Sequence, residues 1–260
     1  MTPRPPQSGT SAEAENELVL SFLAVRRALG VLGLALPVAL MLVALLTDEP
    51  MRPSISEFYF GQGRDLFVGI LCAIGVFLWA YVGYPPAKAG EWPTDRLVSR
   101  VAAVAAIGVA LVPTMDKSAA GGPFQCVTVI QCWLGADLSR ILHYGAAAVF
   151  FAMLAAFCLM LFRRGAPGPQ SADKIARNRI YAICGWVILG AMAAIAVYGM
   201  IYAGRDAAGQ AAMDRSRAVF ILESIGVFAF GISWLVKGES LKPLQRMLEP
   251  DTAPPGDAGP

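Results

Sequence analysis

Six long apolar stretches constrain this chain more than any other feature of its sequence. A helix that crosses a bilayer needs roughly 20 mostly apolar residues in succession. Stretches of about that length lie at residues 28–46, 66–84, 97–115, 138–162, 180–203 and 218–236. The 260 residues include only 15% charged residues, whereas a soluble domain usually has about 25%. We therefore expect an all-α integral membrane protein that folds as a six-helix transmembrane bundle.

The connections between these stretches are too short to fold separately, so we predict one transmembrane domain at residues 13–240. Within it, residues 13–27 have the pattern of a short amphipathic helix that leads into the first span. Residues 1–12 and residues 241–260 are rich in Pro, Gly and polar residues, a composition typical of disorder. We therefore expect a disordered N-terminal tail and a mostly disordered cytoplasmic C-terminal tail.

The basic residues are distributed unequally between the two sides of such a bundle. With six spans, both tails share one side with the second and fourth loops, and that side carries fourteen of the 21 Lys and Arg residues. The opposite side carries the other seven. Basic loops remain in the cytoplasm. We therefore predict a multi-pass protein of a bacterial inner membrane with both termini in the cytoplasm.

Several ionisable residues are predicted to lie near the outer side of the bundle. His143 and Glu223 each lie six residues inside a span, about 9 Å deep at the helical rise. Ionisable residues at such depth usually face the bundle interior and have a partner there. With the polar stretch 54–65 as a rim, we predict an outward-facing polar pocket that binds a lipid headgroup or a small ligand. The candidate ligand-binding residues are Ser56, Glu57, Arg64, Asp65, Asp116, Arg140, His143, Tyr144, Tyr198 and Glu223.

Two other interpretations of this cluster remain open. One is a hydrogen-bonded structural cluster in which Glu223 and His143 satisfy each other, because buried polar groups need partners in any case. The other is a membrane-embedded hydrolase or lipid-modifying enzyme, with His143, Asp65, Asp116 and Glu223 as catalytic candidates. The sequence alone assigns no reaction.

We expect neither a metal nor a cofactor, because the chain has one histidine and no phosphate-binding glycine motif. The expected partners are membrane lipids and a small ligand at the outer face, and no nucleic acid. Cys126 and Cys132 lie in the third loop, on the predicted outer side, where disulfides persist. They are a disulfide candidate, although spacing alone does not bring two Cβ atoms together.

Short motifs along residues 25–240 resemble a known family. They are Ile55-Ser-Glu57, Ile74-Gly-Val-Phe-Leu78, His143-Tyr-Gly-Ala146, and Glu223 ahead of Ala229-Phe-Gly231. In these motifs the chain resembles the six-span DRAM/Sfk-type (Frag-like) membrane proteins and their bacterial relatives of unknown function. The resemblance implies six helices, a polar outer mouth and a role in membrane and lipid organisation, without an established reaction.

A second comparison concerns seven-span lipid hydrolases related to alkaline ceramidase and the progestin/adiponectin receptors. These proteins use a serine, an aspartate and three zinc-binding histidines, and Ser56, Asp65 and His143 could take such roles. The chain departs from that pattern because it has one histidine and no seventh apolar stretch.

Overall fold

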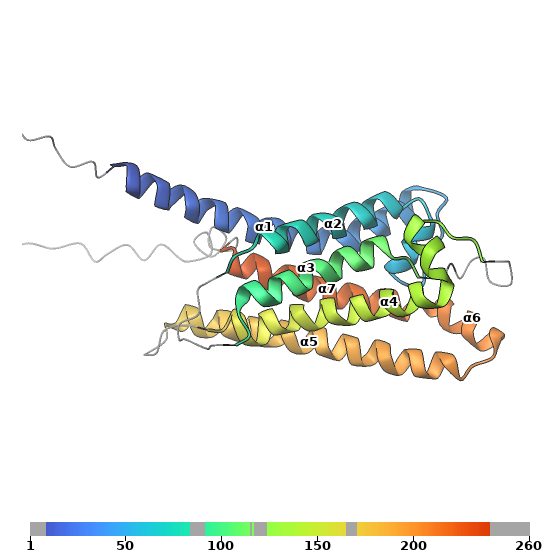
Figure 1. Ribbon diagram of the computed structural model, residues 1–260. Coiled ribbons are helices and arrows are strands. Elements are labelled where there is room, and N and C mark those ends of the chain that lie inside the picture. The colour runs from blue at the N-terminus through green and yellow to red at the C-terminus, as the bar shows by residue number, and fades with distance from the viewer. Residues whose placement is uncertain (1–8, 84–91, 115, 117–123, 165–170, 240–260) are drawn as a thin grey trace, which may run out of the picture.

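The computed structural model describes residues 9–83, 92–114, 116, 124–164 and 171–239, with side chains from Phe22 onward. This part of the chain is helical and contains no strand, which confirms the predicted all-α class. Its elements are α1 (Gly9–Leu46), the 3₁₀ turn η1 (Ser56–Phe60), α2 (Arg64–Ala80), α3 (Asp95–Leu111), α4 (Val129–Ala156), the π-helical turn η3 (Phe157–Leu161), α5 (Ala172–Ala203), α6 (Ala207–Ser216) and α7 (Ala218–Lys237) (Figure 1).

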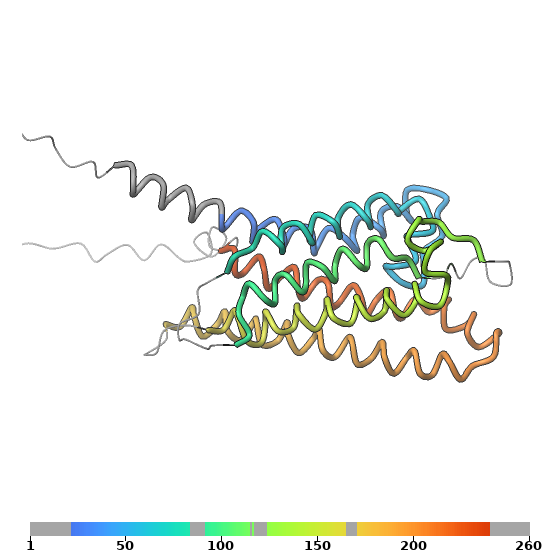
Figure 2. The backbone as a smooth tube through the Cα atoms, viewed as in Figure 1, coloured from blue at the N-terminus to red at the C-terminus, as the bar shows by residue number. Residues whose placement is uncertain are grey.

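Six of these helices form a closed ring of neighbours. α1 packs on α2, α2 on α3, α3 on α4 and α4 on α5, while α7 packs on both α5 and α1. Helices that follow one another through short connections lie antiparallel, and they run side by side along a common axis (Figure 1, Figure 2). The short helix α6 lies at the turn between α5 and α7. The return of α7 to α1 closes the ring.

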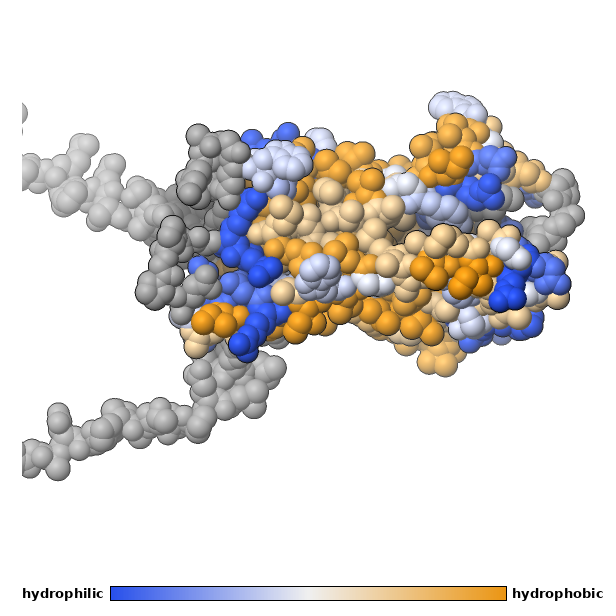
Figure 3. Space-filling model, turned by 90° about the horizontal axis from the view of Figure 1, so that it is seen from below, coloured by the Kyte–Doolittle hydropathy of each residue, from blue (hydrophilic) through white to orange (hydrophobic). Residues whose placement is uncertain are grey.

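The outer surface of the ring is apolar between its two ends. Figure 3 shows hydrophilic residues gathered at both ends of one face and mostly apolar residues between them. Large apolar side chains such as Val31, Val76, Val104, Ile183 and Trp186 are exposed on α1, α2, α3 and α5. A water-soluble protein rarely exposes so extensive an apolar surface. These features indicate a membrane protein.

Length and composition identify four stretches of the described chain as able to cross a membrane. They are Phe22–Leu46, Val129–Leu161, Ala172–Ala203 and Ala207–Lys237, the last of which includes α6 and α7. The helices α2 and α3 have 17 residues each, which is shorter than the predicted spans. α3 ends at Leu111 and not at residue 115, because Pro113 disfavours a helical conformation at Val112.

Other helices are longer than the apolar pattern predicts. Polar side chains cap their starts beyond the apolar stretch: Thr128 accepts a hydrogen bond from the Gln131 amide before α4, and Ser171 caps α5 in the same way. The predicted amphipathic helix and first span are one continuous helix, α1, which passes through Pro37 without a break.

Two features of the ends of the chain and of the loops differ from expectation. Residues 9–12 belong to α1 rather than to a disordered tail, while the remainder of that tail and the tail 241–260 lie outside the described residues. α6 was not expected, because its sequence lacks an apolar face. Its first turn is capped by Asp206, whose carboxylate accepts a hydrogen bond from the Gly209 amide at 2.9 Å.

Candidate functional site

The connection between α1 and α2 folds into the end of the ring that lies away from the N-terminus (Figure 1). We call residues 50–63 the plug. Its 3₁₀ turn is buried, and Phe58 is fully covered with its ring 6.0 Å from that of Phe220. Tyr59 is also buried and meets Phe67 edge-on at 6.3 Å. This connection was expected to form the rim of an outward-facing pocket, and in the structure its aromatic side chains Phe58 and Tyr59 pack inward.

The start of α7 holds the backbone of the plug at two points. The Phe220 amide donates a hydrogen bond to the Pro53 carbonyl at 2.9 Å. The Ile55 amide donates to Glu223 Oε2 at 2.6 Å. The first amides of a helix have no partner within the helix, which leaves the Phe220 N–H free for this contact. The plug is therefore fixed in register against α7 on both sides of Ser54.

A chain of two hydrogen bonds joins the plug to α4 and α3 through His143. His143 Nδ1 lies 2.6 Å from the Val112 carbonyl oxygen, and His143 Nε2 lies 2.9 Å from Ser56 Oγ. A carbonyl oxygen can only accept, so Nδ1 carries the proton and Nε2 accepts from the serine hydroxyl. His143 is 1% exposed and Ser56 is 8% exposed. The structural interpretation paired His143 with Glu223; instead His143 bonds Ser56 and Val112, and Glu223 accepts from the Ile55 amide.

The Val112 carbonyl is accessible to His143 because α3 ends at Leu111, just before Val112. Val112 has an extended backbone with φ −108° and ψ 95°, so its carbonyl does not point along the helix axis as a helical carbonyl would. Pro113 follows it and imposes that conformation. The sequence feature that could have indicated this acceptor is thus Pro113, since the pattern of side chains does not show which backbone carbonyls are free to accept.

A small cavity lies directly beneath the plug. Its volume is about 30 Å³, which is enough for a water-sized group. Ser56 and Glu223 supply the polar side chains of its wall. The apolar lining is Leu36, Ile55, Phe67, Leu71, Val109, Ala147, Phe150, Phe151 and Val227. The cavity is therefore polar at the plug and apolar toward the middle of the ring.

Ion pairs that sequence reasoning missed hold the outside of the plug. Arg52 Nε contacts Glu49 Oε1 at 2.6 Å, and Arg52 Nη1 lies 3.9 Å from Asp116. Glu49 is buried, and its other oxygen accepts from the Gln62 amide at 2.9 Å. The sequence feature that could have indicated these ion pairs is the run of charged residues that follows the first span. Two predicted residues contribute here: Asp116 through its contact with Arg52, and Arg64 by donating to the Tyr59 hydroxyl at 3.1 Å with its guanidinium over the ring.

The remaining predicted residues are spread around this end of the molecule. Asp65 is exposed in the first turn of α2. Arg140 is exposed and pairs with Asp137 at 3.0 Å. Tyr144 is 55% exposed, although its ring meets that of His143 edge-on at 5.9 Å. Tyr198 donates to the Met213 carbonyl at 2.6 Å and thereby joins α5 to α6. Glu57 is buried within the plug, where its amide donates to Ser54 Oγ.

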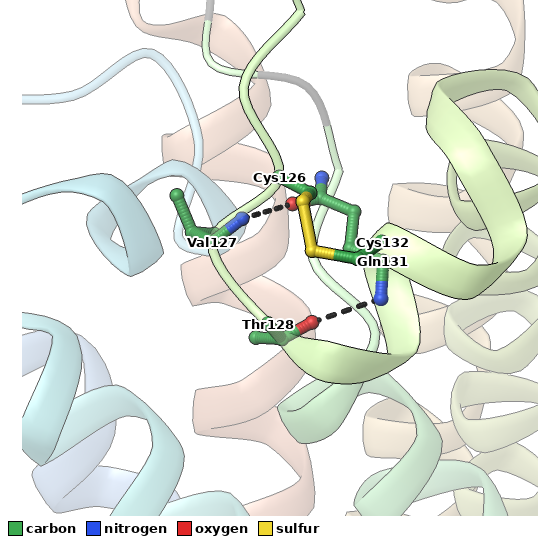
Figure 4. Close-up of a disulfide and its surroundings, with 5 residues drawn as sticks. All are labelled: Cys126, Val127, Thr128, Gln131 and Cys132. Carbon is green, nitrogen blue, oxygen red and sulfur yellow. Dashed lines mark hydrogen bonds between the residues drawn. A yellow bond between two sulfur atoms is a disulfide. The ribbon is translucent and has the colours of Figure 1, made fainter.

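Cys126 and Cys132 form a disulfide with their Cα atoms 5.1 Å apart (Figure 4). Within the loop that the disulfide closes, the side chain of Gln131 accepts a hydrogen bond from the Val127 amide at 2.9 Å (Figure 4). It also donates a hydrogen bond to the Thr114 carbonyl at 3.0 Å. Thr114 lies two residues beyond Val112. The disulfide loop therefore holds the segment that positions the His143 acceptor.

The described residues contain no group of three or more His, Cys, Asp and Glu side chains arranged to hold a metal ion. The site thus consists of a serine, a histidine, a carboxylate and backbone groups above an apolar cavity. Comparisons with protein-family models, with curated proteins and with solved structures find no match to this chain.

Proposed function

We propose that this chain is a six-span protein of a bacterial inner membrane, with both termini in the cytoplasm and the plug facing outward. The closed ring supports six spans, because α2 and α3 fill the gap between α1 and α4. A bilayer that surrounds the apolar outer surface of the ring must also surround these two helices. Their 17 residues extend about 25 Å, close to the roughly 30 Å of hydrocarbon.

The proposed orientation rests on two independent features. The basic residues gather on the side of the termini, as they do on the cytoplasmic side of membrane proteins. The disulfide lies at the opposite end, beside the plug, and disulfides persist in oxidising compartments outside the cytoplasm. The relationship to the DRAM/Sfk-type proteins is part of this proposal and fits the same topology.

We further propose that the protein binds a lipid headgroup or a small ligand beneath the plug, with membrane lipids as its partners. The observation that carries this is the cavity, which has polar groups at the plug and apolar walls below. Sites for small molecules are mostly apolar with a few placed polar groups. An amphiphile with its polar group at Ser56 and Glu223 and its apolar chain along the apolar walls would match both parts of the cavity. A ligand larger than water requires the plug to move outward.

Mass spectrometry of lipids that co-purify with the protein tests this function. Ala147 lines the cavity, whereas its neighbour Ala148 is exposed on the outside of α4. We expect Ala147→Phe to fill the cavity and remove the bound lipid, while Ala148→Phe retains it. Thermal unfolding of both variants checks that they fold. Equal amounts of lipid on the two folded variants would contradict a site beneath the plug.

A further inference from the structure

We infer that Ser56 is a nucleophile and His143 its general base, and that the pair hydrolyses an acyl ester of a membrane lipid. The inference rests on the proposed function, because it assigns chemistry to the same cavity. Nucleophilic serines act through a base within about 2.6–3.2 Å that is itself oriented by a third group. Ser56 Oγ lies 2.9 Å from His143 Nε2, and His143 Nδ1 lies 2.6 Å from the Val112 carbonyl.

The Val112 carbonyl sets the imidazole in the form that a base needs. It holds the proton on Nδ1, so the free lone pair of Nε2 points at the hydroxyl that is to be deprotonated. In a serine–histidine–carboxylate triad the carboxylate performs this orienting role. Here a backbone carbonyl performs it, held in place by the end of α3 and by the Gln131 contact at Thr114.

Two further observations place this pair beside the cavity. Ser56 is one of the residues that line the cavity. The backbone on its N-terminal side is also held at Pro53 and Ile55 by α7. With the plug seated on α7, Ser56 is therefore held beside both the cavity and His143.

The apolar walls define the class of substrate. With the plug moved outward, a carbonyl carbon placed at Ser56 would leave its acyl chain facing the apolar lining, which includes Phe150, Phe151 and Val227. The polar part of the ester would face the plug. An acyl ester with a long chain fits this distribution better than a water-soluble ester.

The reaction balances with water as the second substrate. Ser56 Oγ forms a bond to the ester carbonyl carbon while its proton passes to His143 Nε2. The bond from that carbon to the alcohol oxygen then breaks, and the alcohol leaves with this proton. Water next attacks the acyl-serine, and its proton passes through His143 Nε2 to Ser56 Oγ as the acyl–serine bond breaks. The products are a fatty acid and an alcohol.

A fluorophosphonate with a long alkyl chain tests the inference on the purified full-length protein. The Ser56 oxygen would bond to phosphorus, fluoride would leave, and the proton would pass to His143. We expect an adduct that peptide mass spectrometry places on Ser56 and that Ser56→Ala abolishes. A short-chain probe should react more slowly, because the walls that would hold the chain are apolar.

His143→Gln separates a base from a structural contact. Glutamine can still form hydrogen bonds toward Ser56 or Val112, but it cannot take a proton. We expect about 10²–10⁴-fold slower labelling of a variant that unfolds at the same temperature as the wild type. Ser224→Ala is the matched control, since the Ser224 hydroxyl donates to the Phe220 carbonyl in the preceding turn of its own helix, and it should leave the rate unchanged.

Each outcome decides between the possibilities. Absence of an adduct on Ser56 in a protein that carries lipid would overturn the catalytic inference and leave the binding function intact. Unchanged labelling of His143→Gln would overturn the role of the histidine. Equal rates for long and short probes would overturn the lipid ester as substrate. Retention of lipid by Ala147→Phe would count against the proposed binding function, whatever the result at Ser56.

Discussion

At the scale of single residues, Glu223 has its partner outside its own helix. The carboxylate accepts the Ile55 amide at 2.6 Å, and Ile55 is buried. A buried amide that loses its acceptor costs about 1–3 kcal/mol. We therefore expect an acceptor of the same length to retain most of this contact.

We predict that Glu223→Ala lowers the free energy of unfolding by about 1–3 kcal/mol, because it leaves the Ile55 amide without this acceptor. Glu223→Gln keeps a carbonyl oxygen at the same reach and should lose less than half as much. Chemical unfolding of both variants in detergent measures the difference. If glutamine were as destabilising as alanine, the charge of Glu223 and not its bond to the plug would be responsible.

Single residues also show what the sequence could and could not predict about the site. Counting helical rise placed His143 and Glu223 at one depth, and both do lie at the plug end. Depth does not give direction around a helix axis, so their partners could not be predicted. His143 bonds the plug serine and a backbone carbonyl, and side-chain patterns contain no information about carbonyls. Hydropathy likewise cannot distinguish an exposed polar loop from the buried residues of the plug.

At the scale of elements, α1 and α7 pack closely because small residues meet between them. A Cβ atom at Gly231 would lie 2.9 Å from the Gly30 carbonyl oxygen, which is backbone and cannot rotate away. In lipid, helix association depends on such close approach, since there is little hydrophobic driving force between helices. The contact between the first and last helices is the one that closes the ring.

We predict that Gly231→Ala pushes α7 away from α1 and destabilises the protein by about 1–3 kcal/mol. Gly190→Ala is the matched control on α5, because a Cβ there would meet nothing within 4 Å. It should be neutral or stabilise by up to about 1 kcal/mol, as alanine favours a helix over glycine. Thermal unfolding in one detergent compares the two. Equal effects would mean that helix propensity, and not the α1–α7 contact, governs position 231.

The predicted helix boundaries agree with the structure only where the helix ends together with its apolar stretch. The pattern located all the apolar stretches, but α4 and α5 begin earlier because capping residues Thr128 and Ser171 extend them into polar sequence. α6 has no apolar stripe and was missed for that reason. Local capping contacts, which hydropathy does not include, thus set where these helices start.

At the scale of the whole molecule, the number of spans depends on α2 and α3. Both belong to the ring, yet each has only 17 residues, and the four stretches that meet the length of a span do not include them. If only those four crossed the membrane, residues 47–128 would all lie on one side. With six spans, the α1–α2 and α2–α3 connections face opposite sides. These two topologies assign Trp92 to opposite compartments.

We predict that a cysteine at Asp48 reacts with a membrane-impermeant maleimide applied to intact cells, while a cysteine at Trp92 reacts only after lysis. Both native side chains are exposed, so access to the reagent depends on the side of the membrane. The wild-type protein is the background control, since Cys158 and Cys184 are buried, Cys72 is half-buried and Cys126 pairs with Cys132. Labelling at both sites from outside would indicate four spans. Labelling at Trp92 alone would keep six spans but reverse the orientation, and the plug and its serine would then face the cytoplasm.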